Sequence, residues 1–251
     1  RKNLPLDLKN TRITVDDIIY ALAYANIHRL SIESACQELE NAPSGNRLRE
    51  VLVEALPDRI GMQRMLNRMF RQQLHPSIWK CKRDFNIAID LTLIPYHGQP
   101  HKDKKEIVCG MPKSGTTHFH GYATVSIVRD DRRYVVALHF IEYGEEMADI
   151  VRWLIKRLKK LKIRIRRVFL DKGFCSKPVF KVLDQHKLNY ITPIPVRGKS
   201  GGVRSLFQGK SRKTSYTFNS PKHGQYTVQA VVVKRYSKGR YGRHKSKWFA
   251  Y

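Results

Sequence analysis

The chain has 251 residues, 41% of them hydrophobic, and a formal net charge of +27. That length and apolar content suffice for one large domain, or for a small and a medium one. No stretch approaches the roughly 18 uninterrupted apolar residues of a membrane span, and the first residues lack the pattern of a signal peptide. We therefore expect a globular, cytoplasmic protein with no membrane partner.

The positive charge indicates the class of partner. A chain with this much self-repulsion normally binds a polyanion, and nucleic acid is the obvious one. No Asp or Glu follows Asp184, whereas Lys and Arg continue almost to Tyr251, so protein carboxylates cannot neutralise that region locally. We expect double-stranded DNA as the partner, in association with the nucleoid. A ribosomal or chromatin-like coat protein is the alternative from charge alone.

Residues 1–84 carry the pattern of four short helices. The run Thr14-Val15-Asp16-Asp17 is a capping signal, and apolar residues at helical spacing then mark helices that begin near residues 15, 32, 48 and 58. A small helical domain of this kind can dock on a DNA duplex. A packing or dimerisation role fits equally well, because no recognition helix stands out.

The pattern changes to a period of two at Phe85. In the predicted strand 85–94, Ile87 and Ile89 share one face, while Asp90 lies on the other. A loop rich in Gly, Pro, Lys and His is predicted for 95–117. Two further strands, 118–128 and 134–143, are joined by Asp130-Asp131-Arg132 and therefore predict a hairpin.

Helices and strands alternate in the next segment. A long amphipathic helix is predicted for 145–161 and leads into a strand that ends at Asp171, where Gly173 marks the turn. Ser176-Lys177-Pro178 caps another helix, which is followed by a strand at 190–196. This order predicts an α/β fold with a mixed sheet, in which an antiparallel meander precedes parallel crossover strands.

The C-terminal quarter has a different composition. Residues 197–247 are rich in Gly, Ser, Lys and Arg and contain a predicted strand at 226–233, so we interpret them as a basic β insertion. Residues 247–251 are expected to return toward the core. The predicted domains are thus 1–84, and 85–251 with the insertion inside it. Five basic residues are predicted to contact DNA: Lys113, Lys172, Arg197, Lys199 and Arg204.

Asp90 and Asp171 are the two carboxylates embedded in apolar strand patterns, and a right-handed crossover would place their strands side by side. Carboxyl ends of strands are where open α/β sheets usually place their chemistry. Two such charges repel by about 4 kcal/mol at 4 Å and an effective dielectric constant near 20. A pair of Mg²⁺ or Mn²⁺ ions would offset that repulsion and could activate water for phosphodiester cleavage. Ion pairs with Lys172 or Arg167 are the structural alternative.

Three runs of this sequence closely resemble DDE insertion-sequence transposases of the ribonuclease H-like superfamily. They are Ile-Ala-Ile-Asp-Leu-Thr around Asp90, Asp171-Lys172-Gly173-Phe174, and Lys-Ser-Gly-Thr-Thr-His-Phe-His-Gly-Tyr at 113–122. The resemblance covers about 85–251. It implies a ribonuclease H-like sheet and a metal site with three carboxylates, of which Asp90 and Asp171 are the first two. It also implies cleavage at transposon ends, transfer of the freed 3′ hydroxyl to target DNA, and action as a homodimer.

The third acid of the family does not appear where the resemblance predicts it. It is a Glu on a helix beyond the last core strand, after the insertion, yet no acid follows Asp184 in this chain. Asp184 lies on the helix directly after the Asp171 strand, which is too early. We therefore expect that the sequence stops one element short of that helix. A nuclease or resolvase without strand transfer, and a non-catalytic DNA-binding protein, are the rival functions.

Other motifs point less clearly to chemistry. The cysteines form no C-x-x-C pair and are expected to be reduced core thiols, and the His and Cys residues near the loop fit no standard zinc finger. The Lys113–Thr117 run lacks the upstream glycine of a phosphate loop. Aromatic residues of the insertion could stack on unpaired bases, although most fit simple strand positions. The residues concerned are Cys36, Cys81, Cys109 and Cys175; His97, His101, His118 and His120; and Tyr216, Tyr226, Tyr236, Tyr241 and Trp248.

Overall fold

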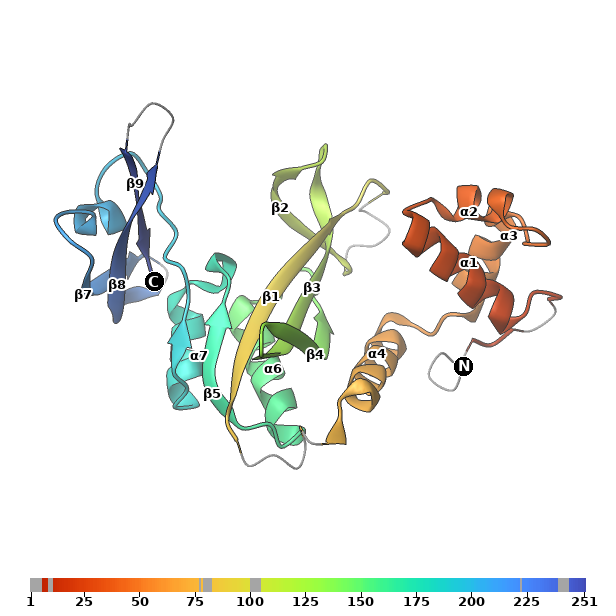
Figure 1. The fold of residues 1–251 in the computed structure, drawn as a ribbon, viewed down its shortest axis with the longest axis horizontal. Coiled ribbons are helices and arrows are strands. Elements are labelled where there is room, and N and C mark those ends of the chain that lie inside the picture. The colour runs from red at the N-terminus through yellow and green to blue at the C-terminus, as the bar shows by residue number, and fades with distance from the viewer. Residues whose placement is uncertain are drawn as a thin grey trace. The chain divides into compact units, whose positions relative to one another are not determined.

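The computed structural model describes residues 6–8, 11–76, 78, 83–99, 105–221, 223–238 and 244–251. The chain divides into two compact units, 1–69 and 70–251 (Figure 1). This division lies before the predicted boundary at 84/85. The reason is that Leu74 and Ile78 are buried in the same apolar cluster as the central sheet.

The first unit is helical. It contains α1 (Val15–His28), α2 (Ile32–Glu38), α3 (Gly45–Ala55) and the first part of α4 (Arg59–Gln73). The predicted capping signal is present, since the Thr14 hydroxyl accepts from the Asp17 backbone N–H while the Asp17 carboxylate accepts from the Thr14 N–H. Its small core consists of Ile18, Ala21, Cys36, Leu48 and Val51.

The second unit is built on a six-stranded mixed sheet in the order β2-β3-β1-β5-β6, with β4 also paired to β3. The strands β1, β3 and β4 pair antiparallel, whereas β1, β5 and β6 run parallel. This confirms the predicted α/β class, the antiparallel meander and the placement of the Asp171 strand beside the Asp90 strand. The strand bounds are β1 Phe85–Pro95, β2 Ile107–Lys113, β3 Thr116–Arg129, β4 Arg132–Phe140, β5 Ile165–Leu170 and β6 Tyr190–Ile191.

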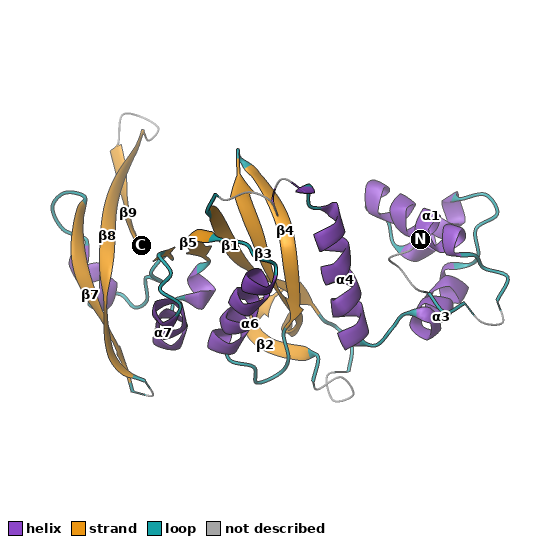
Figure 2. Cartoon of the chain, turned by 90° about the horizontal axis from the view of Figure 1, so that it is seen from below, coloured by secondary structure: helices purple, strands orange, loops and turns teal. Residues whose placement is uncertain are grey.

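One face of this sheet is covered by helices. Alternate residues of the central strands, such as Ile87 and Ile89, are buried in one cluster with α6 (Met147–Lys160) and α7 (Lys177–Gln185) (Figure 2). Parallel strands need such crossover helices, so the order strand, helix, strand fixes this face as the core. The opposite face carries Asp90, which is exposed.

Three predicted segments differ from the structure. The loop predicted for 95–117 contains strand β2, which pairs with β3. The strand predicted for 190–196 ends at Ile191, because Pro193 and Pro195 cannot donate to a ladder. The end of the chain forms a strand that was not predicted, β9 (His244–Ala250), which pairs along β8, whereas the expected return toward the core holds at Ala250, whose carbonyl accepts from the Ile194 N–H at 2.8 Å.

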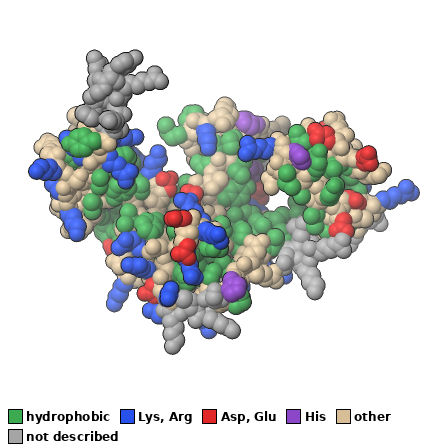
Figure 3. Space-filling model, in the orientation of Figure 1, with side chains coloured by type: hydrophobic (Ala, Val, Ile, Leu, Met, Phe, Trp, Pro, Cys, Tyr) green, Lys and Arg blue, Asp and Glu red, His purple; other side chains and the backbone are tan. Residues whose placement is uncertain are grey.

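The C-terminal sheet has the order β7-β8-β9, with β7 at Arg212–Ser220 and β8 at Gly224–Lys238. It is antiparallel throughout. Its small core contains Ile194, Val203, Ala230 and Ala250. The predicted β insertion is therefore a separate sheet attached to the main one. On the face in Figure 3, Lys and Arg side chains are spread over both sheets, while Asp and Glu are fewer.

Candidate active site

Two carboxylates meet at the carboxyl end of the parallel strands. Ile89 of β1 and Leu170 of β5 are Cα partners in parallel pairing, so Asp90 and Asp171 are the next residues along neighbouring strands. Adjacent strands lie about 4.8 Å apart and successive side chains alternate between faces. Ile89 and Leu170 point to the buried face, so both aspartates lie on the opposite, exposed face.

The backbone at Asp171 is held from two sides. Asp171 is extended, with φ −70° and ψ 161°, and begins a short 3-10 turn, η1 (Lys172–Phe174). Its carbonyl oxygen accepts from the Phe174 N–H at 3.0 Å and from the hydroxyl of Thr192 at 3.2 Å. Thr192 is 5% exposed, so this contact is shielded from water. The turn and the buried threonine together fix where β5 ends.

The side chains at this edge are close to β1. The Asp90 carboxylate accepts from the Leu91 backbone N–H at 3.0 Å. A methyl group at Gly173 would lie 3.7 Å from Leu91 Cδ2 and 3.8 Å from Asp171 Oδ2, so the Asp171 carboxylate lies beside β1. On the other side of Asp90, the half-buried Thr124 of β3 is its Cα partner. Sequence reasoning missed Thr124 and Thr192, because only the register and the tertiary contact bring them here.

The donor set at this edge fits a hard divalent cation. Mg²⁺ and Mn²⁺ prefer oxygen ligands and bind through one or two carboxylates, with water and substrate phosphate completing the shell. Asp90 and Asp171 supply such oxygens from two exposed positions. Within the described residues there is no group of three or more His, Cys, Asp or Glu placed to hold a metal. Asp90 and Asp171 are therefore the candidate oxygen donors at this edge.

The predicted DNA contacts lie in three places. Lys172 follows Asp171 directly and is exposed, and Lys113 is exposed at the end of β2. Arg197 lies near Cys175, where burial raises the pKa of the thiol to about 12 and Arg197 opposes the rise. Lys199 is exposed, and Arg204 in η2 (Gly202–Leu206) donates from Nε to the carbonyl of Gly198 at 2.9 Å.

Asp184 lies away from the carboxylate pair. It is near the C-terminal end of α7, a nine-residue helix about 13 Å long that begins shortly after Asp171. Its carboxylate accepts a hydrogen bond from the Tyr226 hydroxyl. Burial, followed by the hydrogen bond to Asp184, raises the pKa of Tyr226 to about 12. Asp184 therefore links α7 to the C-terminal sheet.

Among the residues that the structure describes, the histidines and cysteines do not assemble into a metal site. His118 of β3 is the Cα partner of Cys109 in β2, and His120 is the partner of Ile107. Cys109 is exposed, so the expectation of a core thiol is wrong there, whereas Cys36 is buried. His101 and Cys81 lie outside the described residues. Lys113 to Thr116 form a tight turn between antiparallel strands, with φ of 52° at Ser114 and 77° at Gly115, which is not the strand-to-helix setting of a phosphate loop.

The aromatic residues of the insertion have mixed placements. Tyr216 and Tyr226 belong to ring clusters, with Tyr216 at 4.8 Å from Phe218, whereas Tyr236 is 69% exposed. Trp248 stacks on Phe207 at 5.8 Å, and Lys234 Nζ lies 5.2 Å from its ring centroid. Tyr241 lies outside the described residues.

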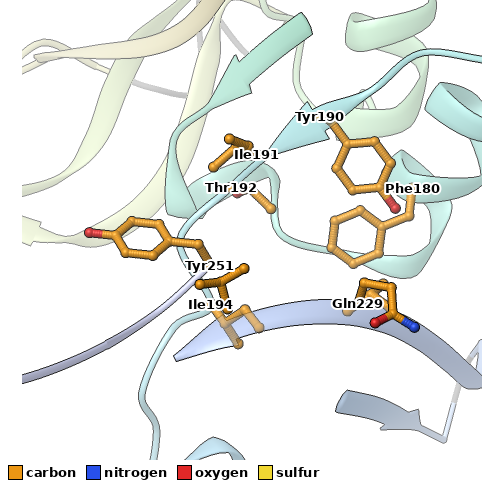
Figure 4. A pocket seen from close by; sticks show the side chains of 9 residues that line it. Phe180, Tyr190, Ile191, Thr192, Ile194, Gln229 and Tyr251 are labelled. Atoms are coloured by element: carbon orange, nitrogen blue, oxygen red, sulfur yellow. The ribbon is translucent and has the colours of Figure 1, made fainter. Parts of the chain in front are cut away.

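An apolar cavity of about 380 Å³ lies between the main sheet and the C-terminal sheet. Phe180 and Tyr190 stack on one side of it, at 5.4 Å and 8°, and Tyr251 lies on the other (Figure 4). Thr192, which holds the Asp171 carbonyl, also lines it. The lining includes no Asp, Glu, Lys, Arg or His, so the cavity is a packing feature beside the carboxylate edge.

Comparison with known proteins gives one family. The family model described as "Transposase DDE domain" matches residues 86–244. Fifteen chains of solved structures match, among them the piggyBac transposase in a cryo-EM synaptic complex with hairpin DNA. That match has 14% identity and a TM-score of 0.44, and covers 97% of this chain and 54% of that chain. This chain thus spans about half the length of that relative. No curated protein sequence matches. None of the described helices is long and apolar enough to cross a membrane.

Proposed function

Because the chain belongs to the transposase DDE domain family, we propose that it cleaves the phosphodiester at transposon ends and joins the freed 3′ hydroxyl to target DNA. The observation that carries this proposal is the register of β1 and β5, which puts Asp90 and Asp171 on one exposed face at one edge. A nuclease or resolvase that stops after cleavage is the second candidate, since it would use the same carboxylates.

The two aspartates would hold a pair of Mg²⁺ or Mn²⁺ ions. When bound, such ions supply a nucleophile from water and stabilise the leaving oxygen of the phosphodiester. The contribution of the protein is to position the two carboxylates. Asp90 is held within a paired strand and Asp171 at a strand end fixed by Thr192, so the carboxylate oxygens are pre-placed. Lys172, next to Asp171, would bind the phosphate that the carboxylates repel.

The basic residues predicted to contact DNA lie in three parts of the second unit. Lys172 and Arg197 lie near the C-terminal end of β5, and Lys113 lies at the tip of the β2–β3 hairpin. Lys199 and Arg204 precede the C-terminal sheet, in a region without Asp or Glu. We propose that they neutralise phosphates, with the DNA bound by a homodimer. Contact with six or more phosphates predicts that affinity falls about a thousandfold between 50 and 200 mM salt. A flat salt response would remove this part of the proposal.

The test replaces each acid separately, as Asp90→Asn and Asp171→Asn, and uses a duplex that carries the ends of the element encoding the chain. We expect no Mg²⁺- or Mn²⁺-dependent cleavage by either variant, while fluorescence anisotropy shows DNA binding at the wild-type level. Asp131→Asn is the matched control. Asp131 is an exposed acid in the β3–β4 turn with φ 57°, a conformation that Asn also tolerates, so cleavage should persist.

Two outcomes are decisive. If cleavage survives in both variants, the metal-site assignment is wrong. If the wild-type protein cuts but yields no joined product with a second duplex, the nuclease candidate replaces strand transfer.

A further inference from the structure

The strands that carry the site extend beyond it. β1 pairs with β5 only as far as Ile89, yet it continues to Pro95 and stays paired with β3 through Phe119. At about 3.3 Å per residue, the five steps from Asp90 to Pro95 carry this ribbon roughly 17 Å past Asp90. Figure 1 shows β1, β2 and β3 running on together beyond the end of β5.

One face of the ribbon continues the face of the carboxylates. Antiparallel partners lie on the same face, and Asp90 is opposite Thr124, Thr92 opposite Tyr122, and Ile94 opposite His120. His118 is two residues N-terminal to His120 in β3, so it lies on the same face, and its partner in β2 is Cys109. We call this set the ribbon face: Thr92, Ile94, Tyr122, His120, His118 and Cys109.

The ribbon face is partly open to solvent and has no acid of its own, although Ile107, the partner of His120, lies on the same face and is only 3% exposed. Thr92, Ile94 and Cys109 are exposed, and the three rings are half-buried. Apart from Asp90, no Asp or Glu occurs in 85–95 or 107–129. The exposed Lys113 lies at the tip of the same hairpin. The named residues include no Lys or Arg, so Lys113 at the hairpin tip supplies the positive charge for an anionic partner.

Two rings of this face are held in place by aromatic contacts. Tyr96 meets His120 edge-on at 5.1 Å and 82°, and Tyr122 meets Phe140 at 5.2 Å and 80°. Imidazole and phenol groups donate hydrogen bonds to phosphate and sugar oxygens. Side chains that are already ordered lose less entropy when they bind. The face thus presents the polar rings of His118, His120 and Tyr122 in a row that leads to Asp90.

We propose that the ribbon face is the track along which duplex DNA lies as it enters the Asp90–Asp171 edge. This inference rests on the proposed function. Each base-pair step of duplex DNA rises about 3.4 Å along the helix axis, so the ribbon of about 17 Å spans about five steps. A second copy of the chain is the rival occupant, but two chains of charge +27 repel each other, and the acid-free face offers no compensating charge.

Cys109 makes the proposal testable with a natural probe. It is an exposed thiol on the ribbon face. The variant Tyr134→Cys adds a comparison thiol, because Tyr134 of β4 is exposed and is the Cα partner of the buried Ile127, so it lies on the face opposite the ribbon face. Both thiols are then alkylated in the same molecule with iodoacetamide, with and without a saturating duplex of about 40 base pairs, and peptide mass spectrometry gives each rate.

We expect the duplex to slow alkylation of Cys109 by about tenfold or more, and that of the thiol introduced by Tyr134→Cys by less than about twofold. Equal rates for the two thiols while anisotropy shows bound DNA would overturn the track and leave the proposed function standing. Absence of DNA binding would overturn the proposed function itself. Protection of Cys109 that rises with protein concentration in the absence of DNA would assign the face to a second copy.

A second variant tests the histidines. The double change His118→Ala/His120→Ala should weaken duplex affinity about five- to tenfold while the far-ultraviolet circular dichroism stays unchanged. His186→Ala is the control, because His186 is also partly buried but caps the C-terminal end of α7, away from the ribbon face. Unchanged affinity in the double variant would count against the proposed contacts.

Discussion

The attachment of the C-terminal sheet to the core can be tested at Phe180. This side chain of α7 is 1% exposed and stacks on Tyr190 of the main sheet. It also contacts two rings of the C-terminal sheet, Phe218 at 5.4 Å and Tyr226 at 5.9 Å. Phe180 is therefore the point at which α7, the main sheet and the C-terminal sheet share one aromatic cluster.

The variant Phe180→Ala should cost about 3–5 kcal/mol, the usual range for removing a buried Phe. Each aromatic pair contributes about 0.5–1.5 kcal/mol of such a loss. Because two of the three partners lie on β7 and β8, part of the cost falls on the attachment of that sheet. A local loss of about 3 kcal/mol raises the population of the detached state by about a hundredfold.

Hydrogen–deuterium exchange measures this directly. Peptides from β7 and β8 should exchange about a hundredfold faster in Phe180→Ala, while peptides from β1 and β3 change much less. The control is Tyr236→Ala, which removes an aromatic ring of β8 that is 69% exposed and should cost within about 0.5 kcal/mol. If β7 and β8 exchanged at the wild-type rate in Phe180→Ala, Phe180 would not be what attaches the C-terminal sheet to the core. Equal acceleration in every strand would show a global loss instead.

Three further predictions use separate groups. The pKa of Tyr226 is raised to about 12, so the unfolded chain ionises this phenol near pH 10 while the folded protein does not. The midpoint of urea unfolding should therefore fall as the pH rises from 10 to 12. The fall should be smaller in the variant Tyr226→Phe. Cys175, with its pKa raised to about 12 by burial, should resist iodoacetamide at pH 8 while the exposed Cys109 reacts, and comparable rates would contradict its burial. Thr14→Ala removes the cap of α1 and should destabilise the helical unit by about 1 kcal/mol in thermal melts, whereas Thr14→Ser should not.

Much of the central sheet is predictable because its signals are local. β1, β3 and β4 alternate with a period of two, and α6 has a clear apolar stripe, so their type and order follow from the sequence. The crossover rule then gives the parallel pairing of β1 and β5. The placement of Asp90 beside Asp171 follows from these two steps.

Other elements could not be predicted from the sequence, for identifiable physical reasons. β2 has a short apolar start followed by Gly110 and Pro112, which are typical of loops, and it is a strand because β3 supplies a partner. β9 is basic and short, and pairs only because β8 is long enough to continue past Val233. The contact from Thr192 to the Asp171 carbonyl depends on tertiary packing and has no sequence signal.

The exposure of Asp90 depends on where β5 stops. Asp90 lies in the middle of β1, where a carboxylate between two paired strands would be crowded and costly to keep charged. β5 ends at Leu170, because the Lys172–Phe174 turn follows at once, so beyond Ile89 only β3 still pairs with β1. The turn therefore does two things, since it ends the strand that would flank Asp90 and it supplies Asp171 at the same edge. A local termination signal and a long-range register together explain how two acids 81 residues apart along the chain come to follow paired residues of neighbouring strands.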